Sequence, residues 1–290
     1  MKNAYLNNLQ VHDNQMASTL GFWLKPLIQG LEMPDIRLPT FDRPNIDGSF
    51  VPNQLYGGRA ITLQGKVTGS GSLATYRTRR SQLESAVKIY RPGGVLTPIT
   101  FKFKTMNDLL LQASVYTKKL KFSDNLITSG DYVLDLYAPD IRLLSQELNQ
   151  TQLNIFEGGG MPLPMPIPMD MSAGGTVLQP ILNAGNFTSL PFFTIRGTIE
   201  DPTISNETTG KSFSITYTLT STAERIEIDV ENRTVLYFAT DTSTGVNIRQ
   251  YFSGDWFDIE PGSNSIKLVV ADITDSGYLL IKWRDAYIGI

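Results

Sequence analysis

Apolar and polar residues alternate along most of the chain, and this period-two pattern predicts a protein built mainly from β-strands. In residues 60–67, for example, Ile61 and Leu63 alternate with polar residues, as in a half-buried strand. Further alternating runs cover residues 96–103, 109–122 and 130–138. Residues 141–148 fit either a short helix or another strand.

One stretch has helical spacing instead. Its apolar residues, Leu73, Tyr76, Leu83 and Tyr90, recur on one face and predict a helix over residues 73–90. Ser72 is a candidate N-cap, and residues 92–94 (Pro-Gly-Gly) end the helix. The outer face carries Arg77, Arg79, Arg80 and Lys88. These side chains could bind phosphate, but a solvated face with Glu84 four residues before Lys88 is the simpler interpretation.

The second half of the chain shows the strand pattern throughout. Alternating runs cover residues 175–184, 191–197, 204–207, 212–219, 225–230, 234–238, 266–270 and 278–290. Strands that recur every eight to twelve residues, with turn signals between them, indicate a β-sandwich.

Two stretches do not fit a regular core. Residues 33–58 are rich in Pro, Gly and Asp-Gly, which predicts a long loop or an extended hairpin with a separate task. Residues 158–174 alternate Pro with Met, Leu and Ile between glycines, so we expect an extended hinge there. The apolar side chains of this hinge would pack on the protein itself or on a partner, or the hinge is a free linker.

The predicted fold class is therefore all-β with one helix, in two domains. Residues 1–157 form an N-terminal antiparallel β domain with helix 73–90 and an arm at 33–58. Residues 158–174 form the hinge between the domains, and residues 175–290 form the C-terminal β-sandwich.

The composition of the chain limits the classes of function that it can have. Of 290 residues, 41% are hydrophobic but only 18% are charged, which suits a surface meant to be covered. The net charge of −3 gives no general basic field for nucleic acid. The chain has no Cys, and its first residues lack the apolar core of a signal peptide. It also has no apolar run of membrane-spanning length. We therefore expect synthesis and folding in a cytoplasm.

Candidate chemistry is sparse. His12 is the single histidine, it has no nucleophile motif beside it, and His- or Cys-based metal sites are excluded. The chain has 28 acidic residues, but no carboxylate pair stands out. Trp256, beside a turn, is a candidate exposed aromatic residue for sugar stacking, whereas Trp283 lies in an apolar run typical of a core strand. We expect no enzyme activity and no cofactor.

Three blocks of residues resemble the distal tail proteins of long-tailed bacteriophages, the siphovirus-type tail component family. The first block comprises Pro34 to Arg37, Pro44 to Gly48 and Tyr56 to Gly65, followed by the arginine-rich helix. The second comprises Asn183 to Asn186, Pro191, Ile195, Gly197, Pro202, Ile204 and Thr208 to Gly210. The third comprises Ile228, Asp229, Ser253, Trp256, Pro261 to Ile266 and Trp283 to Tyr287.

This resemblance implies a structural virion protein at the tail tip. Its N-terminal domain would form a ring, usually of six copies, with an arm over the next subunit, and its C-terminal domain would be a galectin-like sandwich. The partners would be the tail tube protein, the baseplate hub and a receptor-binding protein, with a channel for DNA passage but no specific DNA binding or membrane insertion. The expected interface residues are Pro34, Arg37, Pro44, Tyr56, Arg59, Met161, Pro162, Pro164 and Met165.

Two other functions remain open at this point. One is a carbohydrate-binding module for the host cell wall, which would need an exposed aromatic platform, for example around Trp256. Galectins use a histidine in their sugar site, and residues 175–290 contain none, which argues against direct lectin activity. The other is a tail hydrolase, which would need a cleft with paired carboxylates.

Overall fold

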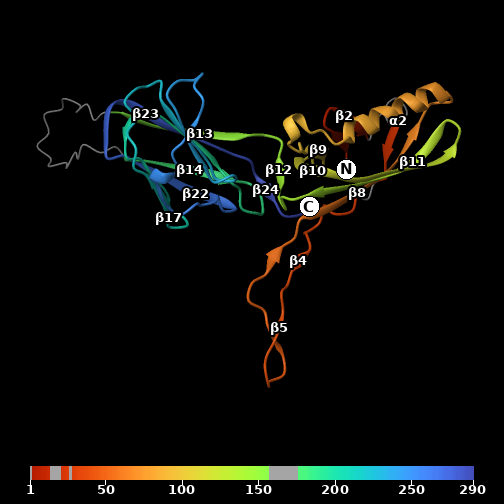
Figure 1. Ribbon diagram of the computed structural model, residues 1–290, viewed down its shortest axis with the longest axis horizontal. Coiled ribbons are helices and arrows are strands. Elements are labelled where there is room, and N and C mark those ends of the chain that lie inside the picture. The colour runs from red at the N-terminus through yellow and green to blue at the C-terminus, as the bar shows by residue number, and fades with distance from the viewer. Residues whose placement is uncertain (1, 14–20, 26–27, 157–175) are drawn as a thin grey trace, which may run out of the picture. The chain divides into compact units, whose positions relative to one another are not determined.

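The computed structural model describes residues 2–13, 21–25, 28–156 and 176–290 (Figure 1). The chain divides into two compact units. The first comprises Met1–Gln146 together with Tyr287–Ile290, and the second comprises Glu147–Ala286. Strands dominate both units, which confirms the predicted all-β class with one helix.

The first unit contains one large antiparallel sheet, in the order β2-β1-β9-β10-β11-β8-β3, with β12 paired to β10. Its strands are β1 (Asn3–Leu6), β2 (Leu9–Asp13), β3 (Phe22–Leu24), β8 (Arg59–Thr68), β9 (Ile99–Lys104), β10 (Leu110–Leu126), β11 (Ser129–Ala138) and β12 (Leu143–Ser145). The ambiguous residues 141–148 therefore contain a short strand. The last named strand of the chain is β24 (Ala286–Tyr287).

Strand β10 is long enough to pair with two different strands in succession. Its first part pairs with β9 and its second part pairs with β11, with a register shift between Thr117 and Lys119. One long strand thus joins two parts of the sheet. The residues that alternate inward from these strands, among them Leu63, Phe101 and Leu134, share one hydrophobic cluster. This is the core that the period-two pattern predicts.

Helix α2 (Leu73–Val87) confirms the predicted helix and ends three residues before the predicted limit. The Ser72 hydroxyl accepts a hydrogen bond from the backbone N–H of Thr75 at 3.3 Å, as an N-cap does. Tyr76, Leu83 and Val87 are buried on its inner face. A short 3-10 turn, η1 (Pro92–Gly94), follows the helix.

The basic face of α2 bonds to the protein's own groups. Arg79 bonds to the Thr68 carbonyl, and Arg80 lies 3.2 Å from Glu84 with its guanidinium over the Phe122 ring. The Glu84 carboxylate therefore pairs with the arginine four residues before it. These bonds support the interpretation as an ordinary solvated face.

The second unit is a sandwich of two antiparallel sheets. One sheet has the order β13-β23-β15-β18-β19-β20, and the other has the order β14-β22-β16-β17-β21. Its elements are β13 (Asn149–Phe156), β14 (Thr176–Asn183), β15 (Phe192–Glu200), β16 (Thr203–Asn206), β17 (Lys211–Ile215), β18 (Arg225–Asp229), β19 (Thr234–Phe238), β20 (Val246–Asn247), η2 (Arg249–Tyr251), β21 (Phe252–Gly254), β22 (Gly262–Val269) and β23 (Asp272–Trp283). Apolar side chains from both sheets meet in one core, as the Phe193 and Phe213 rings do at 5.6 Å.

The boundary between the units differs from the predicted one. Strand β13 pairs along its whole length with β23, from Asn149↔Trp283 to Phe156↔Ser276, so it belongs to the second unit. The predicted hinge, residues 158–174, lies outside the described residues. Because β13 and β14 flank it and both belong to the second unit, it does not separate the two units. The sequence could not predict that β13 belongs to the second unit, because pairing between strands so far apart leaves no local signal.

Candidate assembly surfaces

A long hairpin arm extends from the sheet of the first unit (Figure 1). At its base, β4 (Ile36–Arg37) pairs with β7 (Leu55–Tyr56), and nearer its tip β5 (Phe41–Asp42) pairs with β6 (Ser49–Phe50). This is the extended hairpin that the turn-rich residues 33–58 predict. Each pairing covers two residues per strand, and every residue from 35 to 55 is exposed.

The arm exposes many apolar side chains. Eight large ones are exposed, namely Met33, Ile36, Leu38, Phe41, Ile46, Phe50, Val51 and Leu55. Phe41 and Ile46 are 61% and 70% exposed. A two-stranded hairpin is at best marginally stable alone, and grouped apolar exposure of this kind marks an interaction site.

The tip of the arm has some order of its own. The backbone N–H of Arg43 donates to the Gly48 carbonyl at 3.1 Å, and the Arg43 guanidinium lies 4.8 Å from the centre of the Phe50 ring. Asn45 and Gly48 have positive φ angles of 65° and 104°, which the tight reversal of the chain requires. The cation of Arg43 is thus held against the arm's own aromatic ring.

A buried arginine anchors the base of the arm. The guanidinium of Arg59 donates to the carbonyls of Gly30 at 2.8 Å, Ile141 at 2.8 Å and Ile288 at 2.7 Å, and also to that of Glu32. The side chain is 2% exposed, and its burial lowers the pKa of the guanidinium. Arg59 thereby joins the segment before the arm, the connection between β11 and β12, and the last residues of the first unit.

The predicted interface residues separate into three groups. Arg37 and Pro44 are exposed on the arm, while Tyr56 is half-buried at its base and accepts a bond from Arg37 at its carbonyl. Pro34 and Arg59 are buried within the first unit, so they support the arm and offer no surface to a partner. Met161, Pro162, Pro164 and Met165 lie outside the described residues.

Trp256 is not the exposed aromatic platform that its place beside a turn suggested. It is half-buried against the core of the second unit. The Phe252 ring stacks on it with 4.3 Å between ring centroids, and the guanidinium of Arg249 lies 5.1 Å from the ring centre. Trp283 is buried, as expected, and its indole N–H donates to the Leu182 carbonyl at 3.0 Å.

Three asparagines are buried in the second unit and hydrogen-bond to the backbone of its loops. Asn183, Asn206 and Asn264 are each fully buried. The Asn183 amide donates to the carbonyls of Phe187 at 2.8 Å and Ile259 at 3.2 Å. The Asn206 side-chain amide donates to Oδ1 of Asn264 at 3.0 Å, and the Asn264 amide donates to the backbone carbonyl of Glu260 at 2.8 Å. Buried amides that satisfy backbone groups stabilise loops, so these residues have a structural role.

The other candidate chemistry is structural as well. His12 is buried, and its Nδ1 accepts a bond from the Leu24 backbone N–H at 3.4 Å. Within the described ranges, no group of three His, Asp or Glu side chains is placed to hold a metal ion. No helix in the described part of the chain is long and apolar enough to cross a membrane.

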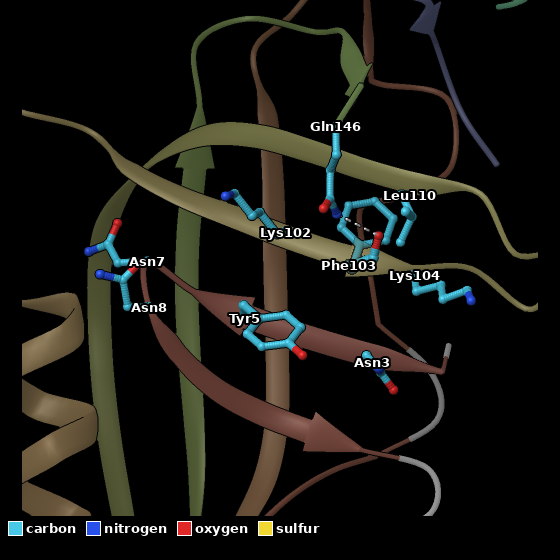
Figure 2. Close-up of a pocket in the computed structure, with 9 residues that line it drawn as sticks. All are labelled: Asn3, Tyr5, Asn7, Asn8, Lys102, Phe103, Lys104, Leu110 and Gln146. Atoms are coloured by element: carbon cyan, nitrogen blue, oxygen red, sulfur yellow. Dashed lines mark hydrogen bonds between the residues drawn. The ribbon is translucent and has the colours of Figure 1, made fainter. Parts of the chain in front are cut away.

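A hollow that sequence reasoning did not predict lies on β1, β9 and β10 (Figure 2). It has a volume of about 440 Å³, and its lining includes Asn3, Tyr5, Asn8, Lys102, Lys104 and Leu110. The Tyr5 ring lies in the middle, and Lys102 lies beside it. Because three strands and the turn after β1 supply these side chains, no spacing along the chain reveals the hollow.

One family model matches part of the chain. Residues 184–287 match the family model of the siphovirus-type tail component, C-terminal domain. No curated protein matches the chain.

Two solved structures share the fold across both units. The crystal structure of the SPP1 Dit protein, described as a paradigm of the hub adsorption apparatus in phages that infect Gram-positive bacteria, is 13% identical; the match covers 97% of each chain with a TM-score of 0.62. A chain of the phage p2 baseplate, in its activated conformation with Sr, is 10% identical over 97% of this chain and 98% of that one, with a TM-score of 0.51.

Proposed function

We propose that this protein forms a ring at the distal end of a phage tail. The proposal starts from the match of residues 184–287 to the C-terminal domain of the siphovirus-type tail component family. The ring joins the tail tube to the baseplate hub and leaves a channel for DNA. Six copies are the expected number. The second unit holds a receptor-binding or other side protein, and the assembly acts at the tail tip of the virion.

The exposed apolar arm is the observation that carries this proposal. A ring requires two different surfaces on each copy, one that reaches out and one that receives. The arm is suited to be the surface that reaches the neighbouring copy, because Phe41, Ile46 and Phe50 are all more than half exposed and the arm has no core of its own. Burial of these side chains against a neighbour would supply the free energy of assembly.

Deleting the arm tests the proposal. The base is closed by a hydrogen bond from the Gly57 N–H to the Asp35 carbonyl at 2.7 Å, so residues 36–56 can be removed while Arg59 and its partners stay. We expect the intact chain to form a discrete oligomer near six times 32.2 kDa and the deleted chain to remain a folded monomer. Light scattering over a range of concentrations, with negative-stain images of the oligomer, measures both.

A milder variant controls for the deletion. Replacing Phe41, Ile46 and Phe50 with Ser should also prevent assembly, whereas Ile127→Ser, at a side chain that is 79% exposed elsewhere in the first unit, should not. Full rings from the arm-deleted chain would contradict the proposal.

A further inference from the structure

The arm tip carries negative charge as well as apolar side chains. Asp42 and Asp47 lie beside Phe41 and Ile46, and neither carboxylate has an ion pair among the described residues. The nearby cation, Arg43, lies over the Phe50 ring. A surface that receives the tip should therefore offer both apolar area and positive charge.

The hollow on β1, β9 and β10 combines these two properties. Tyr5 and Leu110 supply its apolar surface, and Leu110 is 42% exposed. Its volume of about 440 Å³ lies within the range of roughly 300 to 1,000 Å³ that is usual for pockets that bind ligands. The amides of Asn3 and Asn8 provide further polar groups at the ends of the hollow (Figure 2).

Positive charge exceeds negative charge at the hollow. Lys104 and Lys2 lie 2.9 Å and 2.7 Å from the carboxylate of Asp108, so one acid serves two lysines. Hydrogen bonds from the two lysines lower the pKa of Asp108 to about 2. Lys102 has no ion pair in the described part of the chain. Over these four side chains, three positive charges face one negative charge, an excess of two.

A second exposed apolar surface of the first unit, the loop after α2, is less suited to hold the tip. The loop after α2 exposes Ile89, Tyr90, Val95 and Leu96, but every residue from 88 to 98 is exposed. No residue of this loop belongs to the lining of the hollow on β1, β9 and β10.

We propose that the arm tip of one copy, residues 41–50, docks in the hollow of a neighbouring copy. The apolar tip residues lie against Tyr5 and Leu110, and Asp42 or Asp47 pairs with Lys102. The inference rests on the proposed ring, because it names the surface that receives the arm.

Crosslinking tests this contact directly. The chain has no Cys, so single introduced thiols are unique. Chains with Ile46→Cys are mixed with an equal amount of chains with Leu110→Cys, and a short bismaleimide is added. We expect a mixed dimer linked through residues 46 and 110, identified by mass spectrometry. A link between the two variants cannot arise within one chain.

Matched positions control for chance contact. Val95→Cys reports the loop after α2, and Ile127→Cys reports a distant site, where the native side chains are 70% and 79% exposed. Crosslinking of Ile46→Cys to either of these as efficient as to Leu110→Cys would overturn the proposal.

Charge reversal gives an independent readout. Lys102→Glu, or Asp42→Lys with Asp47→Lys, should raise the midpoint concentration of assembly by about fivefold. The combined variant should recover the original midpoint, whereas Lys88→Glu, on the loop after α2, should have no effect. Reversal of Lys102 without effect would overturn the docking contact.

The outcomes separate this inference from the proposed function. If the intact chain assembles and loses assembly with the arm, but neither crosslinks at residue 110 nor responds to Lys102→Glu, the ring stands and the docking contact is wrong. If the intact chain stays monomeric at every concentration, the ring proposal is contradicted and the docking contact falls with it.

Discussion

At the scale of single residues, Arg59 anchors the base of the arm. Its guanidinium serves four backbone carbonyls from three segments of the first unit. We expect Arg59→Ala to destabilise the first unit by about 3 kcal/mol, since bonds from a charged group are lost and buried carbonyls are left without donors. Arg59→Lys should recover only part of this, because an ammonium lacks the planar fork.

Hydrogen exchange provides a local measurement. The Ile290 amide donates to the Leu31 carbonyl at 3.2 Å, so its protection reports whether the last residues are held in place. Protection should fall in Arg59→Ala and remain in Arg37→Ala, where the arginine is exposed on the arm. Unchanged exchange in Arg59→Ala would contradict the anchoring role.

A second residue-scale prediction concerns Tyr132. Its hydroxyl is buried and has no hydrogen-bond partner among the described residues, and burial raises the pKa of the phenol. Tyr132→Phe removes an unsatisfied polar group and keeps the ring. The free energy of unfolding should therefore stay unchanged or rise by up to ~1 kcal/mol. Chemical denaturation measures this, with Tyr132→Leu, which loses ring packing, as a control that should destabilise. A clear loss of stability in Tyr132→Phe would show that the hydroxyl has a partner.

At the scale of elements, the helix offers a direct test of local sequence chemistry. Ser72 caps α2 through its bond from the Thr75 N–H. Ser72→Ala should cost about 1 kcal/mol, whereas Ser72→Asp should keep the cap. Hydrogen exchange in the first turn of α2 measures the difference; equal exchange in the two variants would mean that the cap contributes nothing.

The elements also show what a sequence can predict. Helix α2, strand β8 and the hairpin arm depend on local signals such as spacing, caps and turn residues, and all three were predicted near their observed positions. Strand β13 was assigned to the wrong unit because its partner, β23, lies more than a hundred residues away. The burial of Arg59 and Trp256 likewise depends on distant residues, so their surroundings could not be predicted.

At the scale of the whole molecule, the chain has a discontinuous first unit with the second unit inserted between Gln146 and Tyr287. We expect residues 147–286 to fold alone, because they contain their own hydrophobic core. Residues 1–146 alone lack the Ile288 carbonyl that Arg59 binds. They should be about 2 kcal/mol less stable than the same fragment with residues 287–290 attached by a flexible linker.

Thermal unfolding of these fragments tests the division. Equal stability of the first-unit fragment with and without residues 287–290 would contradict the role of the last residues. Failure of residues 147–286 to unfold cooperatively would contradict the independence of the second unit.

The bond between Arg59 and Ile288 also sets an order of events during synthesis. The two residues are 229 positions apart, which the ribosome covers in roughly ten to fifty seconds. Throughout that interval the second unit can fold, while Arg59 still lacks one of its acceptors. The base of the arm is therefore completed last, and until translation has passed residue 288 the arm extends from a first unit that lacks one of its anchoring bonds.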